Sequence, residues 1–292
     1  MVQVVARSVS RQVKEWLGEG RSAGKVLAVH ARACNLVTDQ GAVIALVVPG
    51  IGDGPLNIVL GDWPGCMSGV QAGTRVTCGP DRLLLDGFKI ALDAADTWEP
   101  CPNWDDLRAA RGAIEASLER LVAIGLDHDS NNVLVPLLGE PSFAQGLASI
   151  LVQRFREAAL QLKAGWRGDE GALAEGGAAL AGLGDGLTPA GDDFLMGVML
   201  WAWLAHPTPR QFCETLSQAA VPRTTIFSAA FLEAAARGQC SIAWHRLLAA
   251  LAEDRPKIAG AAQGVLARGA SSGLDALIGF LYLSQDKEDA CR

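Results

Sequence analysis

The sequence has no strongly basic segment and no long hydrophobic run, and each absence excludes a class of protein. Its 292 residues carry 25 Lys and Arg against 32 Asp and Glu, which gives a formal net charge of −7. An acidic chain without basic clusters lacks the electrostatic surface that binds nucleic acid. The most apolar stretch, 194–205, is much shorter than the roughly 20 residues that span a bilayer. We therefore expect a protein that binds neither nucleic acid nor a membrane.

Closely spaced cysteines and histidines are absent as well. The seven cysteines are scattered, with no C-x-x-C pair, and the four histidines form no H-x-x-x-H pair. A disulfide framework or a zinc site is therefore disfavoured. Residues 1–15 also lack the apolar segment of a signal peptide. Both observations favour a cytoplasmic protein with reduced thiols. The cysteines are Cys34, Cys66, Cys78, Cys101, Cys213, Cys240 and Cys291.

Hydrophobic residues make up 50% of the chain, and their pattern changes near residue 100. Before it, short β-branched segments alternate with Gly, Pro and Asp at intervals of about 8–15 residues. This predicts a small antiparallel β domain, either barrel-like or a sandwich. The intervals are too short for the crossover helices of a parallel sheet. The expected strands are 26–29, 42–48, 56–60, 75–78 and 83–85.

Helical periodicity is found before residue 20 and again after residue 103. A short N-terminal helix is expected because four apolar residues share one face: Val9, Val13, Trp16 and Leu17. Later apolar residues recur at spacings of 3, 4 and 7, which is typical of helices with one buried face. These stripes begin at Trp104, Leu147, Phe227, Trp244 and Leu274. We predict an α+β fold, with a β-rich domain over 1–98, a proline-containing joint and a mainly α-helical domain over 103–292.

The 33 glycines exceed the usual share, and several of them precede one helix. Residues 182–193 read GLGDGLTPAGDD and lead into the apolar run 194–205. Thr188 suits the N-cap of this helix and Pro189 its first position. Glycines there permit positive φ and a close approach of backbone to a ligand, while a helix N-terminus offers N–H groups to an anion.

The carboxylates of the same segment act against an anion site. Asp185, Asp192 and Asp193 beside a free helix N-terminus would repel an anion. They could instead bind a cation, take up a proton or hold the loop by accepting N–H bonds. An ordinary capped helix accounts for one such residue but not for two adjacent ones, which point about 100° apart around the helix.

Two later segments start helices in the same way. Pro222-Arg223-Thr224-Thr225 offers two hydroxyls and a guanidinium, which suit a planar anion. In 269–275, Ser272 with Asp275 is nearly a capping box. Each segment taken alone is explained by an ordinary cap. Three such N-termini would form a pocket for a small polar metabolite if they converge.

The histidines give weaker signals. His30, near Cys34, is expected at a strand end. His128 lies in the polar segment 127–132, which we interpret as an exposed turn rather than as part of a site. His206 follows the apolar helix and suits its C-terminal cap.

The three helix starts carry the features of a known family. Residues 184–197, with the pattern G-x-G-L-T-P-x-G-D-D-F-L-x-G, resemble the signature of the bacterial AllH family. This family is named after a subunit of oxamate carbamoyltransferase, which acts in allantoin catabolism, a route of purine degradation. Residues 223–238 and 272–279 are similar to later blocks of the family, and the resemblance covers roughly 180–284. The family often has Ser at the position of Ala190, so no hydroxyl acts there in this chain.

The resemblance implies transfer of a carbamoyl group between an oxamate-like amide and phosphate, in the cytoplasm and beside partner subunits. Helix N-termini and an arginine suit the negative charge of carbamoyl phosphate. Asp192 and Asp193 are then the candidate catalytic residues, which orient or deprotonate the amide nitrogen or hold a Mg²⁺ ion. The implied substrate-binding residues are Gly184, Gly186, Thr188, Arg223, Thr224, Thr225, Ser271, Ser272 and Asp275.

Two alternatives to a carbamoyltransferase subunit remain open. The first is a non-catalytic subunit for metabolite binding or assembly. The second is a metal-dependent hydrolase that uses Asp192 and Asp193 on a divalent ion, with Mg²⁺ as the candidate cofactor. The expected ligand is a small anionic metabolite: carbamoyl phosphate, phosphate or an oxamate-like compound.

Overall fold

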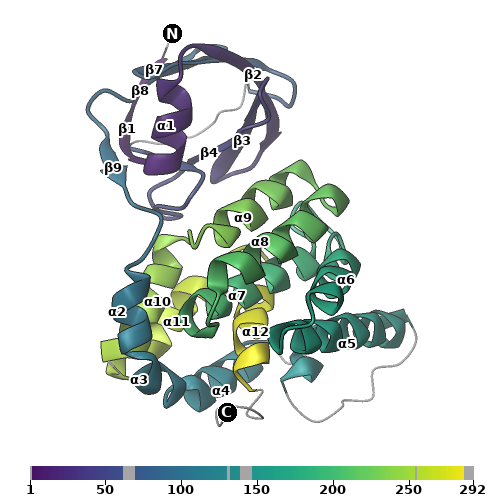
Figure 1. Ribbon diagram of the computed structural model, residues 1–292. Helices are drawn as coiled ribbons and strands as arrows, with labels where there is room; N and C mark the ends of the chain where they lie inside the picture. Colours follow the sequence, from purple (N-terminus) through teal and green to yellow (C-terminus); the bar gives the residue numbers. More distant parts are fainter. Residues whose placement is uncertain (1, 62–69, 130–131, 139–146, 254, 286–292) are drawn as a thin grey trace. The chain divides into compact units, whose positions relative to one another are not determined.

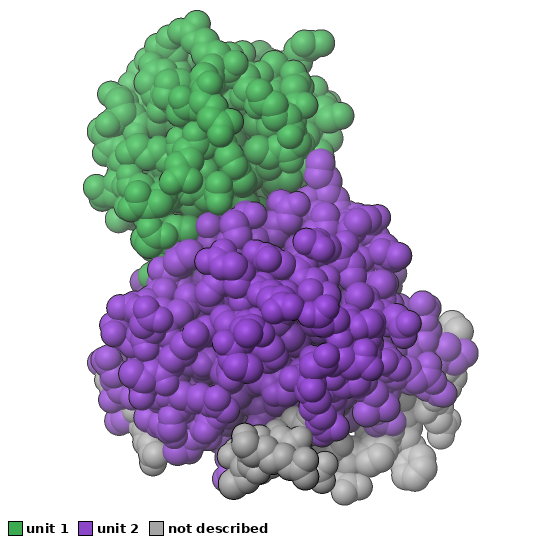
Figure 2. Space-filling view, in the orientation of Figure 1, with its two compact units in different colours: residues 1–100, 240–242 green, residues 101–239, 243–292 purple. Residues whose placement is uncertain are grey.

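The computed structural model of the chain describes residues 2–61, 70–129, 132–138, 147–253 and 255–285 (Figure 1). The chain divides into two compact units, which Figure 2 colours separately: residues 1–100 with 240–242, and residues 101–239 with 243–292. The first unit consists mainly of strands and the second of helices. This confirms the predicted α+β class, with a β-rich part followed by a mainly helical part.

The first unit is a closed β-barrel. Its described residues form a nine-stranded sheet in the order β5-β4-β3-β2-β6-β7-β8-β1-β9, and β1 also pairs with β5, which closes the barrel. This closure decides between the two predicted architectures in favour of the barrel. The strands are β1 (Val2–Ser10), β2 (Ser22–Val29), β3 (Ala33–Thr38), β4 (Val43–Val47), β5 (Asn57–Leu60), β6 (Arg75–Cys78), β7 (Arg82–Leu85), β8 (Phe88–Ala91) and β9 (Asp96–Trp98).

The strand directions are mixed rather than purely antiparallel. Strand β1 runs parallel to β8 and β9, and β4 runs parallel to β5, while the other pairings are antiparallel. Short turns between neighbouring strands favour antiparallel hairpins, which is what the spacing predicted. The partners of β1 are distant in sequence, so turn spacing does not determine their direction.

The N-terminal residues form a strand before the expected helix begins. Helix α1 spans Arg11–Gly18 and buries Val13 and Leu17, as the shared face predicted. Val9, however, belongs to β1, in which Val4 and Ala6 are buried and Val5 is exposed. This alternation is the period-2 signal of a strand. The strand signal was overlooked because Val9 also fits the apolar spacing of the helix that follows.

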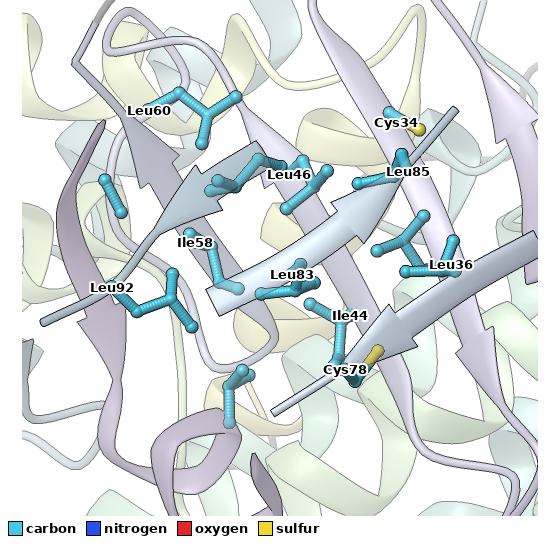
Figure 3. Packing of buried hydrophobic residues seen from close by; sticks show 14 of the residues in the cluster. Cys34, Leu36, Ile44, Leu46, Ile58, Leu60, Cys78, Leu83, Leu85 and Leu92 are labelled. Atoms are coloured by element: carbon cyan, nitrogen blue, oxygen red, sulfur yellow. The ribbon is translucent and has the colours of Figure 1, made fainter. Parts of the chain in front are cut away.

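Apolar side chains fill the barrel. Residues from several strands, among them Leu36, Ile44, Ile58 and Leu83, point inward and are essentially inaccessible to solvent (Figure 3). Small barrels are commonly filled by their own side chains in this way. A short segment from much later in the sequence completes the unit, because Cys240 N donates to Pro100 O and Ile242 N to Asp53 O.

The second unit is built around helix α7. This helix packs against α8, α9 and α12, and most of its residues are buried. The predicted stripe that begins at Trp104 is divided among three short helices, α2 to α4, rather than forming one helix. The α-helices are α2 (Trp104–Ala109), α3 (Arg111–Glu115), α4 (Leu118–His128), α5 (Leu147–Trp166), α6 (Glu170–Leu180), α7 (Ala190–Ala205), α8 (Pro209–Ala220), α9 (Ile226–Ala236), α10 (Ile242–Glu253), α11 (Ile258–Leu266) and α12 (Ser272–Ser284). Short 3₁₀ helices are η1 (Val135–Leu137), η2 (Val221–Arg223) and η3 (Arg255–Lys257).

Glycines allow α7 and α12 to cross at very short range. A Cβ atom added to Gly197 would lie 1.9 Å from Ala276 O, and one added to Gly279 would lie 2.0 Å from Phe194 O. No side chain fits at either position. The two backbones therefore meet directly, and this contact fixes the position of the N-terminal turn of α7 relative to that of α12.

Within the described ranges, Cys34, Cys78, Cys101, Cys213 and Cys240 are free, while Cys66 and Cys291 lie outside those ranges. Of the helices that the structure describes, none is long and apolar enough to cross a bilayer.

Candidate functional site

The glycine-rich loop before α7 adopts a backbone that other residues would strain. Gly182, Gly184 and Gly186 all have positive φ, at 69°, 117° and 99°. A Cβ atom would lie 2.7 Å from Arg223 O at Gly182 and 2.8 Å from Ala190 N at Gly184, whereas at Gly186 it would meet open space. The first two glycines therefore allow close packing inside the protein, and only Gly186 faces an open region.

Helix α7 begins one residue later than predicted, so its cap differs from the expected one. Pro189 is the N-cap residue, and its carbonyl accepts hydrogen bonds from the N–H groups of Asp192 and Asp193. Thr188 does not cap the helix. Its hydroxyl lies 3.0 Å from the hydroxyl of Ser272 instead. The predicted cap was wrong because this contact with α12 takes the threonine side chain.

The loop brings the N-termini of three helices together. Thr188 contacts Ser272 at the start of α12, as described above. Thr225, the N-cap of α9, donates from its hydroxyl to Leu187 O at 2.8 Å, and Ser228 Oγ lies 3.4 Å from the same carbonyl. The three segments singled out in the sequence thus lie side by side in one unit. From the sequence alone, convergence was only the condition under which these N-termini would form a pocket.

Asp192 connects the glycine-rich loop to the start of α9 through hydrogen bonds. It is 3% exposed, and its Oδ1 accepts from Gly182 N at 2.9 Å. Its Oδ2 accepts a short hydrogen bond from the Thr224 hydroxyl. Both oxygens therefore have protein partners. The geometry gives Asp192 the role of holding the loop, one of the roles that the sequence left open.

Asp193 has a different environment. It is 5% exposed, and its Oδ2 is buried without a hydrogen-bond partner among the described residues. Burial raises the pKa of Asp193 to about 8, because desolvation penalises the charged form. Hydrogen bonding by Ser272 and Thr188 partly offsets this rise, while the charges of Asp275 and Asp192 add to it. At neutral pH the Asp193 carboxyl is therefore largely protonated.

Asp275 does not form the predicted capping box. The N-cap of α12 is Ser271, whose side chain makes no capping bond, and Ser272 is already the first helical residue. Asp275 is 1% exposed, and its Oδ1 accepts from Asn132 Nδ2 at 2.7 Å. Burial is the largest cause that raises the pKa of Asp275, and the hydrogen bond from Asn132 opposes it. The proposed box was wrong because Ser272 is the first helical residue rather than the N-cap, and Asp275 Oδ1 accepts from Asn132.

Asn132 is a site residue that sequence reasoning missed. It belongs to segment 127–132, which we interpreted as an exposed turn. Its side chain is 9% exposed, donates to Asp275 and accepts from Leu134 N at 2.8 Å. Residues 130 and 131 of the segment lie outside the described ranges, and Asp129 is exposed. The signal that could have found Asn132 is its place directly before the apolar residues 133–138.

Replacing Asn132 with alanine should destabilise the helical unit. The substitution leaves both oxygens of the buried Asp275 carboxyl without an amide donor, and it removes the hydrogen bond to Leu134 N. An unsatisfied buried group of this kind costs about 1–3 kcal/mol. Chemical denaturation at pH 7 measures the loss. Asn103→Ala, which removes an exposed helix cap in the same unit, is the comparison and should cost about 1 kcal/mol.

The cationic residue of the site lies at its surface. Arg223 is exposed, and one of its N–H groups donates to Ala219 O at 2.8 Å. Asp185, at the tip of the loop, is exposed as well. At α7, Gly191 N donates to Leu183 O, so the N–H groups of residues 191–193 all have carbonyl partners. An anion would therefore find its donors at Arg223 and the start of α9 rather than at α7.

A metal site is not formed by the acidic residues of the described chain. No group of three or more His, Cys, Asp or Glu side chains in the described ranges could hold a metal ion. Asp192 has both oxygens occupied by protein donors. The residues present do not fit a Mg²⁺ ion, and we derive no metal-dependent step.

A separate hollow of about 920 Å³ lies at the other end of α7. His206, the C-cap residue of α7, contacts the rings of Trp166 and Phe212 there, with centroid distances of 4.8 Å in both cases. None of the residues predicted to bind substrate lines this hollow.

Comparisons with known proteins agree with the resemblance seen in the sequence. Residues 180–284 match the family model described as oxamate carbamoyltransferase subunit AllH, and residues 5–97 match the AllH family N-terminal domain. Together the two matches cover most of the chain. No solved structure matches this chain. The chain therefore belongs to the AllH family, which is named after a subunit of oxamate carbamoyltransferase.

Proposed function

We propose that this chain is the subunit of a carbamoyltransferase that binds the reacting amide at the junction of the loop with α7, α9 and α12. The observation that supports this proposal is the convergence of the three helix starts around Thr188, Thr225 and Ser272. Carbamoyl transfer needs a group to orient an amide nitrogen and donors to stabilise a phosphate. Hydroxyls and carboxyls on one side of the loop, and Arg223 on the other, supply the two kinds of group.

The amide of the acceptor and the phosphate of carbamoyl phosphate differ in charge, and the residues on the two sides of the loop differ in charge as well. The uncharged amide group of an oxamate-like acceptor suits the side formed by Thr188 and Ser272, whose hydroxyls can donate or accept and interact with the protonated Asp193. A dianionic phosphate suits the exposed Arg223 and the N-terminus of α9. An added Cβ atom at Gly186 would meet nothing within 4 Å, so the loop leaves room for a ligand there.

Turnover in the presence of the partner subunits tests this proposal. The assembled complex should consume oxamate and carbamoyl phosphate and release phosphate. Ser272→Ala should lower kcat/KM by about 10- to 100-fold, because it removes a hydrogen bond to the reacting group worth about 1.5–3 kcal/mol. Phosphate release under initial-rate conditions gives the measurement.

Ser284→Ala is the matched control for this experiment. Ser284 is the last residue of the same helix, and its hydroxyl donates to Leu281 O rather than toward the loop. It should leave kcat/KM unchanged. A complex with the wild-type chain that transfers no carbamoyl group, or a Ser272→Ala complex as active as wild type, would contradict the proposal.

A second candidate function is binding without catalysis by this subunit. One observation favours it. The side-chain oxygens of Asp192, Thr224 and Thr225 all form hydrogen bonds within the protein. Under this alternative, oxamate or phosphate still raises the melting temperature of the chain. That shift would survive Asp193→Asn, and turnover by the complex would survive it too.

A further inference from the structure

Asp193 and Asp275 are neighbouring carboxyl groups that share an unusual feature. Each is more than nine-tenths buried, and each has one buried oxygen, Oδ2, without a hydrogen-bond partner among the described residues. They lie near the N-terminal ends of α7 and α12, whose backbones meet at Gly197 and Gly279. The crossing of α7 and α12 brings their N-terminal turns together, where the hydroxyls of Thr188 and Ser272 lie 3.0 Å apart.

Among the described residues, the charges that act on this pair are all negative. Asp193 is influenced by the charges of Asp275 and Asp192, and Asp275 by that of Asp129, all of them acidic. The other groups that act on the pair are the hydroxyls of Thr188, Ser272 and Ser271 and the amide of Asn132. Two neighbouring carboxylates in a buried site cannot both remain ionised, so they retain one proton between them.

Two hydroxyls connect the buried pair with the outside of the loop. Ser272 and Thr188 are only partly buried, and their oxygens lie 3.0 Å apart. Hydrogen bonding by both hydroxyls lowers the pKa of Asp193, opposing the effect of its burial. A hydroxyl can accept a proton on one side while it donates one on the other. The four residues thus form a continuous path from the partly exposed loop to the buried carboxyls.

We propose that Asp193 and Asp275 act as one acid–base pair, and that Thr188 and Ser272 pass protons between this pair and the amide of a bound acceptor. This inference rests on the proposed function, because it assigns proton transfer to the same site. Thr188 and Ser272 touch the ligand, whereas the carboxyls act through them. Asn132 is a positioning residue, since its amide holds Asp275 Oδ1, while Oδ2 has no partner among the described residues.

The pair balances the protons of the transfer. A C–N bond forms between the acceptor nitrogen and the carbamoyl carbon, and the C–O bond to phosphate breaks, with its electron pair going to phosphate oxygen. The proton lost by the nitrogen enters the pair through a hydroxyl, and the pair then releases one proton through the same hydroxyls to water. The departing phosphate, on the Arg223 side of the loop, takes up one proton from water. The pair therefore ends each turnover with the single proton with which it began, and no further reactant is needed.

Carbon NMR of the full chain labelled at the aspartate carboxyls tests the coupling without any substrate. In the wild-type protein one buried carboxyl should titrate near pH 8, as expected for Asp193. Asp275→Asn should move this titration to lower pH, because it removes a neighbouring negative charge. Asp185→Asn, an exposed residue of the same loop, should leave it unchanged. A titration that stays in place in Asp275→Asn would overturn the pair.

Ser272→Ala provides an independent variant should Asp275→Asn fail to fold. Hydrogen bonding by Ser272 lowers the pKa of Asp193, so its loss should move the same titration to higher pH. No movement in this variant would mean that the hydroxyl is not connected to the carboxyl, and the proposed proton path would be wrong.

Kinetics of the assembled complex then test the catalytic role. Asp193→Asn and Asp275→Asn should each lower kcat by about 100-fold or more, leave KM for oxamate within a few fold, and remove the basic limb of the pH profile. If wild type is active and these variants keep its kcat and pH profile, the pair has no catalytic role although the proposed function stands. If wild type itself is inactive, the proposed function fails while the NMR titration still decides whether the pair exists.

Discussion

Replacing Gly279 with alanine should unfold the helical unit or destabilise it by at least about 3 kcal/mol. The new methyl group would lie 2.0 Å from Phe194 O and 2.8 Å from Phe194 C, both backbone atoms. Side chains can rotate away from such a contact, but a helix backbone can yield only by moving the whole of α7. Overpacking of this kind commonly costs about 1–3 kcal/mol even where side chains can give way. Tryptophan fluorescence during denaturation by urea measures the effect.

Gly264→Ala is the control for this prediction. Gly264 lies in α11, and an added Cβ atom there would meet nothing within 4 Å. Alanine is the better helix former, so the variant should gain up to about 1 kcal/mol. A loss of similar size in both variants would mean that glycine at the crossing of α7 and α12 has no special role. The assignment of Gly279 to a backbone contact would then be wrong.

The sequence was informative where a residue acts through its own neighbours in the chain. Strand β6 lies at the predicted residues 75–78, and α5, α9, α10 and α12 follow the predicted apolar stripes. These stripes depend on local periodicity, which a single sequence shows directly. Helices α6, α8 and α11 were not predicted. The first and last are rich in Ala and Gly, so they offer little contrast between a buried and an exposed face.

Contacts between distant segments could not be deduced in the same way. The sequence marked Thr188 and Ser272 as helix caps because such residues commonly cap helices. In the structure they contact one another, across a separation that no local pattern encodes. Asn132 was missed for the same reason, since its partner Asp275 lies far along the chain. Local rules therefore identified most members of the site but assigned several of them the wrong partner.

The chemical difference between Asp192 and Asp193 likewise depends on contacts with distant segments. The two residues are adjacent and identical, and no local pattern separates their roles. Asp192 accepts hydrogen bonds on both oxygens, while Asp193 keeps one buried oxygen unpaired. The cause is the direction in which each side chain leaves α7: one faces Thr224 before α9, and the other faces the α12 side of the loop. That difference decides which carboxyl holds a proton.

The stability of the protein should fall as the pH rises from about 4 to about 8, and Asp193→Asn should remove much of this fall. The pKa of Asp193 is raised to about 8, against about 4 in an unfolded chain, so the folded state binds this proton more tightly. The resulting stabilisation is complete below about pH 4 and is lost as the pH rises through about 8. A difference of this size corresponds to on the order of 5 kcal/mol.

Denaturation by urea at a series of pH values measures this dependence. An asparagine at position 193 cannot ionise, so the variant should lose less stability than wild type toward pH 8 and should be the more stable protein there. Part of the fall should persist, because burial also raises the pKa of Asp275. Asp185→Asn should reproduce the wild-type curve, since Asp185 is exposed on the same loop. Parallel curves for wild type and Asp193→Asn would show that Asp193 is ionised at neutral pH, and its place as the proton-holding carboxyl of the site would be lost.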